Sequence, residues 1–127
     1  MARVSPCIAI VDDDRAVLKA LSRLLRSRAF RVYIYGSGPE FIASLPNGLP
    51  ECLIVDLEMP AMSGLQLQHL IRNGILIPTI MISAHRDAAE LQEQENTGLV
   101  AFLLKPLQDS FLLAAIDKAI GAPRGSG

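Results

Sequence analysis

The chain has 127 residues and a mass of 13.7 kDa, which is the size of one ordinary domain. Half of its residues are hydrophobic and a fifth are charged, so the composition excludes a mainly disordered chain. Its 12 basic and 13 acidic side chains leave a net charge of −1, which excludes a globally basic nucleic-acid-binding protein.

The amino-terminal half alternates between two periodicities. Residues 8–11 form a short β-branched run that predicts a buried strand, and apolar side chains over 17–25 recur along one helical face. A more mixed run at 32–35 predicts an edge strand. A predicted helix at 37–45 follows it, with a proline near its start, where helices tolerate one.

The remaining residues continue the same alternation. Further strands are predicted at 52–55, 79–82 and 100–104, and further helices at 63–72, 86–96 and 109–120. The predicted helix at 86–96 is unusually polar, since Leu91 is its only large apolar residue.

Five strand–helix repeats predict an α/β fold with a parallel sheet. Runs of this kind suit strands that helices bury on both faces. One compact solution is a doubly wound five-stranded sheet in the order 2-1-3-4-5, in which ligands bind beyond the carboxyl ends of strands 1 and 3.

Four aspartates follow these two strands. Asp12, Asp13 and Asp14 come after the first strand, and Asp56 comes after the third. Asp13 or Asp14 can cap the next helix, and we assign Asp14 to that role. Carboxylates this close repel one another unless a hard cation lies between them, and Mg²⁺ prefers oxygen ligands. We therefore expect Asp13 and Asp56 to bind Mg²⁺ directly, with Asp12 binding directly or through water.

Two other strand ends carry polar groups. Ser83 follows the fourth strand, where its hydroxyl could donate to a phosphoryl oxygen, and Lys105 follows the fifth, where its charge could neutralise one. Phosphoryl transfer requires in-line positioning, a metal and a cation, and a carboxylate can serve as the nucleophile. The set predicts that Asp56 attacks phosphorus and that Lys105 stabilises the developing charge.

These residues resemble the receiver domain of bacterial two-component response regulators, and most closely its FixJ-type branch. The resemblance covers roughly residues 7–121 and implies the flavodoxin/CheY-like fold. It rests on Ile-Val-Asp12-Asp13-Asp14, Val55-Asp56-Leu-Glu-Met-Pro60-Ala-Met-Ser-Gly64, Ile82-Ser83-Ala84-His85 and Phe102-Leu-Leu-Lys105-Pro106.

The resemblance implies a role for each residue of the site. Asp56 is the expected phosphoacceptor. The expected ligands of Mg²⁺ or Mn²⁺ are Asp12, Asp13, Asp56 and the backbone carbonyl of Glu58.

The same resemblance implies a switch. Ser83 is the expected switch hydroxyl, Phe102 the switch aromatic and Lys105 the family's lysine, with a cis bond between Lys105 and Pro106. The switch hydroxyl is a serine here, where threonine is commoner in the family.

The resemblance also implies partners. A sensor histidine kinase would phosphorylate a receiver domain at residues 1–121, and the basic face of the first helix would help to dock it. Residues 122–127 would be a tail, or the start of a linker to a C-terminal DNA-binding output domain for transcription regulation. A homodimer through the fourth helix (86–96), the fifth strand (100–104) and the fifth helix (109–120) is a further expectation, although the polar 86–96 segment argues against the usual form.

Simple counts bear on location, and the resemblance bears on catalysis. Cys7 and Cys52 are too few for a disulfide framework and favour a reduced, cytoplasmic setting, and no apolar run is long enough to cross a membrane. We expect the domain to assist its own phosphorylation and dephosphorylation but not to turn over an external substrate.

Three other functions fit parts of the pattern. A flavin mononucleotide binder would need a Gly/Ser/Thr-rich loop where this chain has three aspartates. A Mg²⁺-dependent phosphohydrolase would use Glu58 as a second acid, two residues after Asp56. A degenerate receiver would bind partners without phosphorylation, and it is the main alternative.

Overall fold

The structure, a computed structural model, describes residues 5–57, 67, 77–85 and 99–121. Its elements are β1 (Cys7–Val11), α1 (Arg15–Ser27), β2 (Arg31–Tyr35), α2 (Gly38–Ser44), a 3₁₀ turn η1 (Leu45–Asn47), β3 (Cys52–Asp56), β4 (Thr79–Ser83), β5 (Leu99–Leu104) and α5 (Asp109–Gly121). The predicted helices at 63–72 and 86–96 lie outside the described residues, apart from the buried Leu67.

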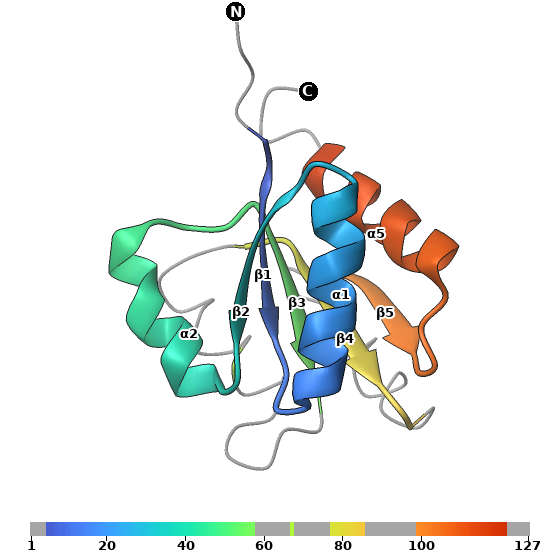
Figure 1. Cartoon of the computed structure of the whole chain (residues 1–127), viewed down its shortest axis with the longest axis horizontal. Helices are drawn as coiled ribbons and strands as arrows, with labels where there is room; N and C mark the ends of the chain where they lie inside the picture. Colours follow the sequence, from blue (N-terminus) through green and yellow to red (C-terminus); the bar gives the residue numbers. More distant parts are fainter. Residues whose placement is uncertain (1–4, 58–66, 68–76, 86–98, 122–127) are drawn as a thin grey trace, which may run out of the picture.

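The five strands form one parallel sheet in the order β2-β1-β3-β4-β5 (Figure 1). The predicted order, the five strands and the edge position of β2 are thereby confirmed. All five residues of β3 and of β4 are buried, as expected of central parallel strands, whereas the edge strand β2 buries only Val32 fully.

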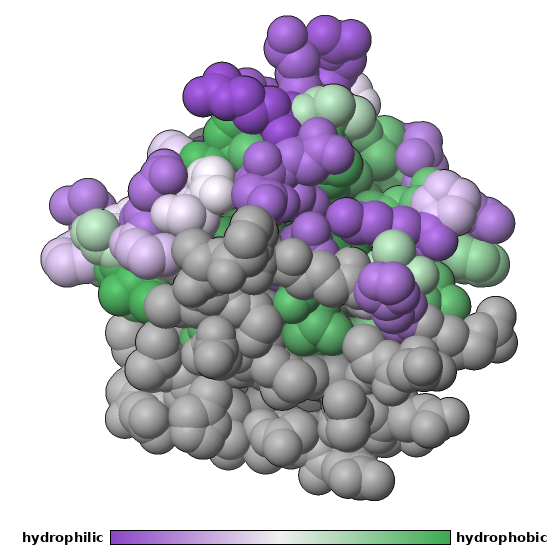
Figure 2. Space-filling view, turned by 90° about the horizontal axis from the view of Figure 1, so that it is seen from below, coloured by the Kyte–Doolittle hydropathy of each residue, from purple (hydrophilic) through white to green (hydrophobic). Residues whose placement is uncertain are grey.

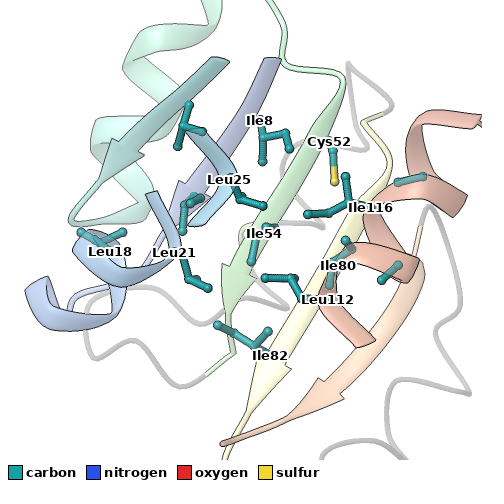
Figure 3. Packing of buried hydrophobic residues seen from close by; sticks show 14 residues of the cluster. Ile8, Leu18, Leu21, Leu25, Cys52, Ile54, Ile80, Ile82, Leu112 and Ile116 are labelled. Carbon is teal, nitrogen blue, oxygen red and sulfur yellow. The ribbon is translucent and has the colours of Figure 1, made fainter. Parts of the chain in front are cut away.

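Helices α1 and α5 cover one face of the sheet, and α2 covers the other (Figure 1). On the first face, leucines of α1 pack against isoleucines of the central strands (Figure 3). Residues such as Ile10 and Leu25 have no exposed surface there. On the second face, Phe41 of α2 packs with β1 and β3 residues, and its ring meets Tyr35 edge-on at 5.4 Å.

Helix α1 begins and ends with defined caps. The Asp14 carboxylate accepts hydrogen bonds from the amides of Ala16 and Val17 at 2.9 and 3.4 Å, which confirms its predicted capping role. At the other end, Ala29 has a φ of +71°, and the amide of Phe30 reaches back to the carbonyl of Leu25. This is the Schellman arrangement, which glycine favours at the position that Ala29 occupies.

Within the part of the chain that the structure describes, no helix has the length and apolarity that a membrane span requires.

Candidate functional site

The acidic residues lie where the two central strands end. Asp12 directly follows β1, and Asp56 is the last residue of β3. Val11 pairs with Val55, so the two aspartates that come next are neighbours across the parallel pair. Asp12 has no exposed surface and Asp56 is 4% exposed. The fold therefore buries two carboxylates at one edge of the sheet.

Three carboxylates meet at this edge. One oxygen each from Asp12, Asp13 and Asp56 lies within 4.8 Å of the others. Asp13 is exposed, so the group opens to solvent on its side. Figure 2 looks at this end of the molecule, and hydrophilic residues cross the middle of the view among those drawn in colour.

The Lys105 ammonium reaches the same group. Its Nζ lies 3.3 Å from Asp56 Oδ2 and 3.8 Å from Asp12 Oδ2. Lys105 follows β5, and its amide donates to the carbonyl of Ser83 at 2.8 Å. This hydrogen bond holds the backbone of Lys105 against the end of β4. The bond between Lys105 and Pro106 is cis, as the resemblance implies. The structure thus brings a cation from the far edge strand to the two buried carboxylates.

The environment of Asp12 disfavours its ionised carboxylate. Burial raises its pKa to about 6, and the Asp56 and Asp13 charges add to the rise, whereas the Asp14 amide and the Lys105 ammonium lower it. Asp12 Oδ1 accepts the Asp14 amide at 2.8 Å. Its other oxygen, Oδ2, is buried without a hydrogen bond.

This arrangement fits a hard divalent cation. A buried carboxylate oxygen without a hydrogen bond is costly in the protein alone, and a cation offers it a partner. Three carboxylates with oxygens this close form an all-oxygen donor set, which suits Mg²⁺ or Mn²⁺. Glu58, the fourth predicted ligand, lies outside the described residues.

Ser83 ends β4, beside the acidic group, and is fully buried. Its Oγ accepts the His85 amide at 2.9 Å and lies 3.4 Å from the His85 carbonyl, so the hydroxyl belongs to a local turn. Met81 pairs with Phe102 and Ser83 with Leu104, which places Ser83 and Phe102 on the same face of the sheet, two pairs apart. Phe102 is half-buried and packs against the α2-side core.

Two contacts of the site have no signal in the sequence motifs. The amide of Asp12 donates to the carbonyl of Tyr35 at 3.1 Å, and the amide of Leu57 donates to that of Ile82 at 2.9 Å. Both acceptors are backbone groups of a neighbouring strand. Only the strand order could have indicated them, because any residue type can supply such a carbonyl.

The chain is similar to known proteins. Residues 8–117 match the family model described as the response regulator receiver domain. The chain is 42% identical over 114 residues to the response regulator protein TmoT of Ectopseudomonas mendocina, covering 89% of this chain and 52% of TmoT. It is 36% identical over 113 residues to the transcriptional regulatory protein FixJ of Rhizobium meliloti strain 1021, covering 88% of this chain and 55% of FixJ.

Solved structures agree. The crystal structure of FixJ-N superposes with a TM-score of 0.83 at 33% identity, covering 97% of this chain and 98% of that one. The response regulator StyR gives a TM-score of 0.85, also at 33% identity, covering 92% of this chain and 60% of that one. The chain spans about half the length of the curated relatives it matches. With a matching family model over most of its length and the acidic group at the switch point of the sheet, the chain belongs to the response regulator receiver domains of two-component signalling systems.

Proposed function

We propose that Asp56 is the phosphoacceptor of this receiver domain and that it takes the phosphoryl group from a sensor histidine kinase. One observation carries the proposal. Oxygens of Asp12, Asp13 and Asp56 lie within 4.8 Å of one another, and Lys105 Nζ lies 3.3 Å from Asp56. Phosphoryl transfer needs this combination of a carboxylate nucleophile, a metal site and a fixed cation.

The chemistry is a substitution at phosphorus. A carboxylate oxygen of Asp56 bonds to phosphorus while the bond from phosphorus to the kinase's histidine nitrogen breaks, and the imidazole leaves with the electron pair. Lys105 starts close to the nucleophile and balances the charge that gathers on the phosphoryl oxygens. The carboxylates of Asp12, Asp13 and Asp56, with the backbone carbonyl of Glu58, would hold Mg²⁺ or Mn²⁺, which would supply further charge neutralisation.

The new charge then acts as a switch. A phosphoryl group adds about −1.5 to −2 charges and several acceptor oxygens. Ser83 Oγ exchanges its turn with His85 for a hydrogen bond to the phosphoryl group, and Phe102 moves with it. Phe102 belongs to β5, so the readout would be a changed surface on β5, α5 and the predicted helix at 86–96. Leu104 and Phe111 expose apolar surface there, 36% and 60% of each residue, which suits homodimerisation.

The partners follow from the surface and the relatives. Arg15, Lys19 and Arg23 are exposed along α1 and give it a basic face that favours an acidic kinase surface. A Lys19→Glu variant should slow transfer from the kinase without changing labelling by acetyl phosphate.

We further propose that residues 1–121 form a receiver domain that controls a C-terminal DNA-binding output domain in the cytoplasm. It would not turn over an external substrate.

Labelling by acetyl phosphate tests the phosphoacceptor. We expect intact-mass analysis to show one added phosphoryl group on the wild type in Mg²⁺ and none in EDTA. Asp56→Asn should remain unlabelled. Asp14→Asn is the matched control, because it changes a carboxylate of the same loop that caps α1, and asparagine also caps helices. Asp14→Asn should therefore label like the wild type.

Two outcomes would contradict the proposal. Labelling that survives Asp56→Asn would place the acceptor elsewhere. A folded wild type that stays unlabelled at all Mg²⁺ concentrations would support the degenerate receiver, which binds partners without phosphorylation.

A further inference from the structure

A pocket of about 400 Å³ lies on the α2 side of the sheet, between the edge strand β2 and the chain from α2 to β3. We call it the β2 pocket; its lining comes from Cys7 and Ala9 of β1, from β2, and from residues 41–50. Its volume is within the range of small-molecule sites in proteins. The acidic group lies at the carboxyl end of the strands, whereas Cys7 begins β1, so most of the pocket is remote from it.

Small side chains on β1 create the hollow. Cys7 and Ala9 lie on the α2 face, whereas Ile8 and Ile10, on the other face, are fully buried under α1 and α5. Helix α2 has only seven residues and gives way to a 3₁₀ turn, so it does not cover the first residues of β1 and β2.

Aromatic rings wall the pocket. Tyr33 and Tyr35 are alternate residues of β2 and share the α2 face, and Phe41 closes the inner side. Rings so placed can stack on a flat ligand or meet its edge. Tyr33 is 51% exposed and therefore lies at the mouth.

Arg31 supplies a positive charge to this space. Among the described residues of the lining it is the only charged one, and the Glu51 carboxylate lies just outside the lining, where its Oε1 accepts the Cys7 amide at 2.9 Å. Arg31 Nε donates to the carbonyl of Ser5 at 2.9 Å, which holds the side chain in place, and no ion pair to Arg31 occurs among the residues that the structure describes. A guanidinium held in this way can bind a carboxylate with its other N–H groups.

We propose that the β2 pocket binds a small aromatic carboxylate, with its ring between Tyr33, Tyr35 and Phe41 and its carboxylate on Arg31. This site is independent of phosphorylation at Asp56, so either proposal can fail without the other.

Benzoate is the probe, followed by chemical shifts of the ¹⁵N-labelled protein. We expect saturable shifts at the amides of Ala9, Tyr33 and Gly48 with a Kd of about 1–10 mM, which is reasonable for a ligand this small. Acetate, which has the charge but no ring, should cause no saturable shift at these amides. Benzyl alcohol, which has the ring but no charge, should bind more weakly than benzoate.

Two variants divide the interaction. Arg31→Gln should weaken benzoate about three- to tenfold and leave benzyl alcohol unchanged, whereas Arg31→Lys should keep part of the benzoate affinity. Cys7→Leu should fill the pocket and abolish binding of both ligands. Ala9→Val is a second filling variant if Cys7→Leu fails to fold, which the protein's own spectrum will reveal.

Three results would overturn the assignment. Benzoate shifts scattered over the surface would indicate no site, and normal binding by a folded filling variant would place the ligand elsewhere. The third result would come from sedimentation at the same protein concentration. If the protein is a dimer without ligand, and dilution to the monomer shifts these same amides, a second copy of the chain covers the pocket face.

Discussion

Ile10 and Asp12 lie two residues apart in the same strand region, and both are completely buried, but burial has opposite thermodynamic consequences for them. Ile10 packs among the isoleucines and leucines under α1 and α5, where removal from water stabilises the fold. Asp12 is removed from water at the carboxyl end of β1. One of its oxygens has no hydrogen bond, and burial raises its pKa to about 6. The core of the sheet therefore supplies stability, and the carboxyl end of its strands loses part of it by burying carboxylates that could hold a cation.

The largest expected effect lies in the core. Ile10→Ala should lower the free energy of unfolding by about 3–4 kcal/mol, because it removes buried methyl groups and leaves a cavity. Urea denaturation measures the change. Ile34→Ala is the matched control, since Ile34 belongs to the edge strand and is 45% exposed, and it should cost clearly less. Equal losses would mean that the two positions are packed alike.

The buried Asp12 at the carboxyl end of β1 should make the stability of the metal-free protein depend on pH. Since burial raises the pKa of Asp12 from 3.8 to about 6, the native state binds more protons than the unfolded state between those pH values. Stability from this group is therefore present below pH 4 and is lost as pH rises to about 6, by up to about 3 kcal/mol. The measurement is the difference between unfolding free energies of the wild type and Asp12→Asn across this range in EDTA. A difference that does not vary with pH would contradict the raised pKa.

Neutralising the buried carboxylate at neutral pH should reverse the usual sign of a core substitution. In EDTA at pH 7, Asp12→Asn should raise the free energy of unfolding by about 1–2 kcal/mol, because asparagine keeps the acceptor for the Asp14 amide and removes the buried charge. Mg²⁺ at a hundred times its Kd should stabilise the wild type by about 2.7 kcal/mol and the variant much less. Asp117→Asn, an exposed change on α5, should have little effect in either condition.

The smallest effect lies away from both regions, at the end of α1. Ala29→Gly should stabilise the protein by about 0.5–1 kcal/mol, because Ala29 has a φ of +71° and glycine adopts that conformation without strain. Ala20→Gly is the matched control in the exposed middle of the same helix, and it should destabilise by a similar amount. Thermal unfolding of the two variants should therefore shift in opposite directions.

The sequence predicts most of the fold because each element has a strong local signal. Apolar runs predict the buried strands β3 and β4, and an apolar stripe predicts the face of α1 that packs on the sheet. The alternation of strands and helices then leaves few possible topologies. The assignment of the α1 cap to Asp14 rather than Asp13 is also confirmed, since the Asp14 side chain accepts the first amides of the helix.

The site is predictable in composition but not in its energetics. The motifs identify Asp12, Asp56 and Lys105, because strand order brings their positions together. The burial of Asp12 and the turn that occupies the Ser83 hydroxyl depend on packing and backbone geometry, which no motif encodes. The β2 pocket is harder to predict from the sequence, because it is the space that the small side chains of Cys7 and Ala9 leave empty.

The hydrogen bond from the Asp12 amide to the Tyr35 carbonyl ties the loop of the three aspartates 12–14 to the edge strand β2. An edge strand has a single neighbour in its sheet, so β2 needs to break fewer hydrogen bonds than β1 or β3 to open. Each local opening of β2 releases the Asp12 amide to exchange its proton with water. Hydrogen exchange at this one amide therefore records how often the end of β2 detaches, and a cation that holds Asp12 in place should slow it.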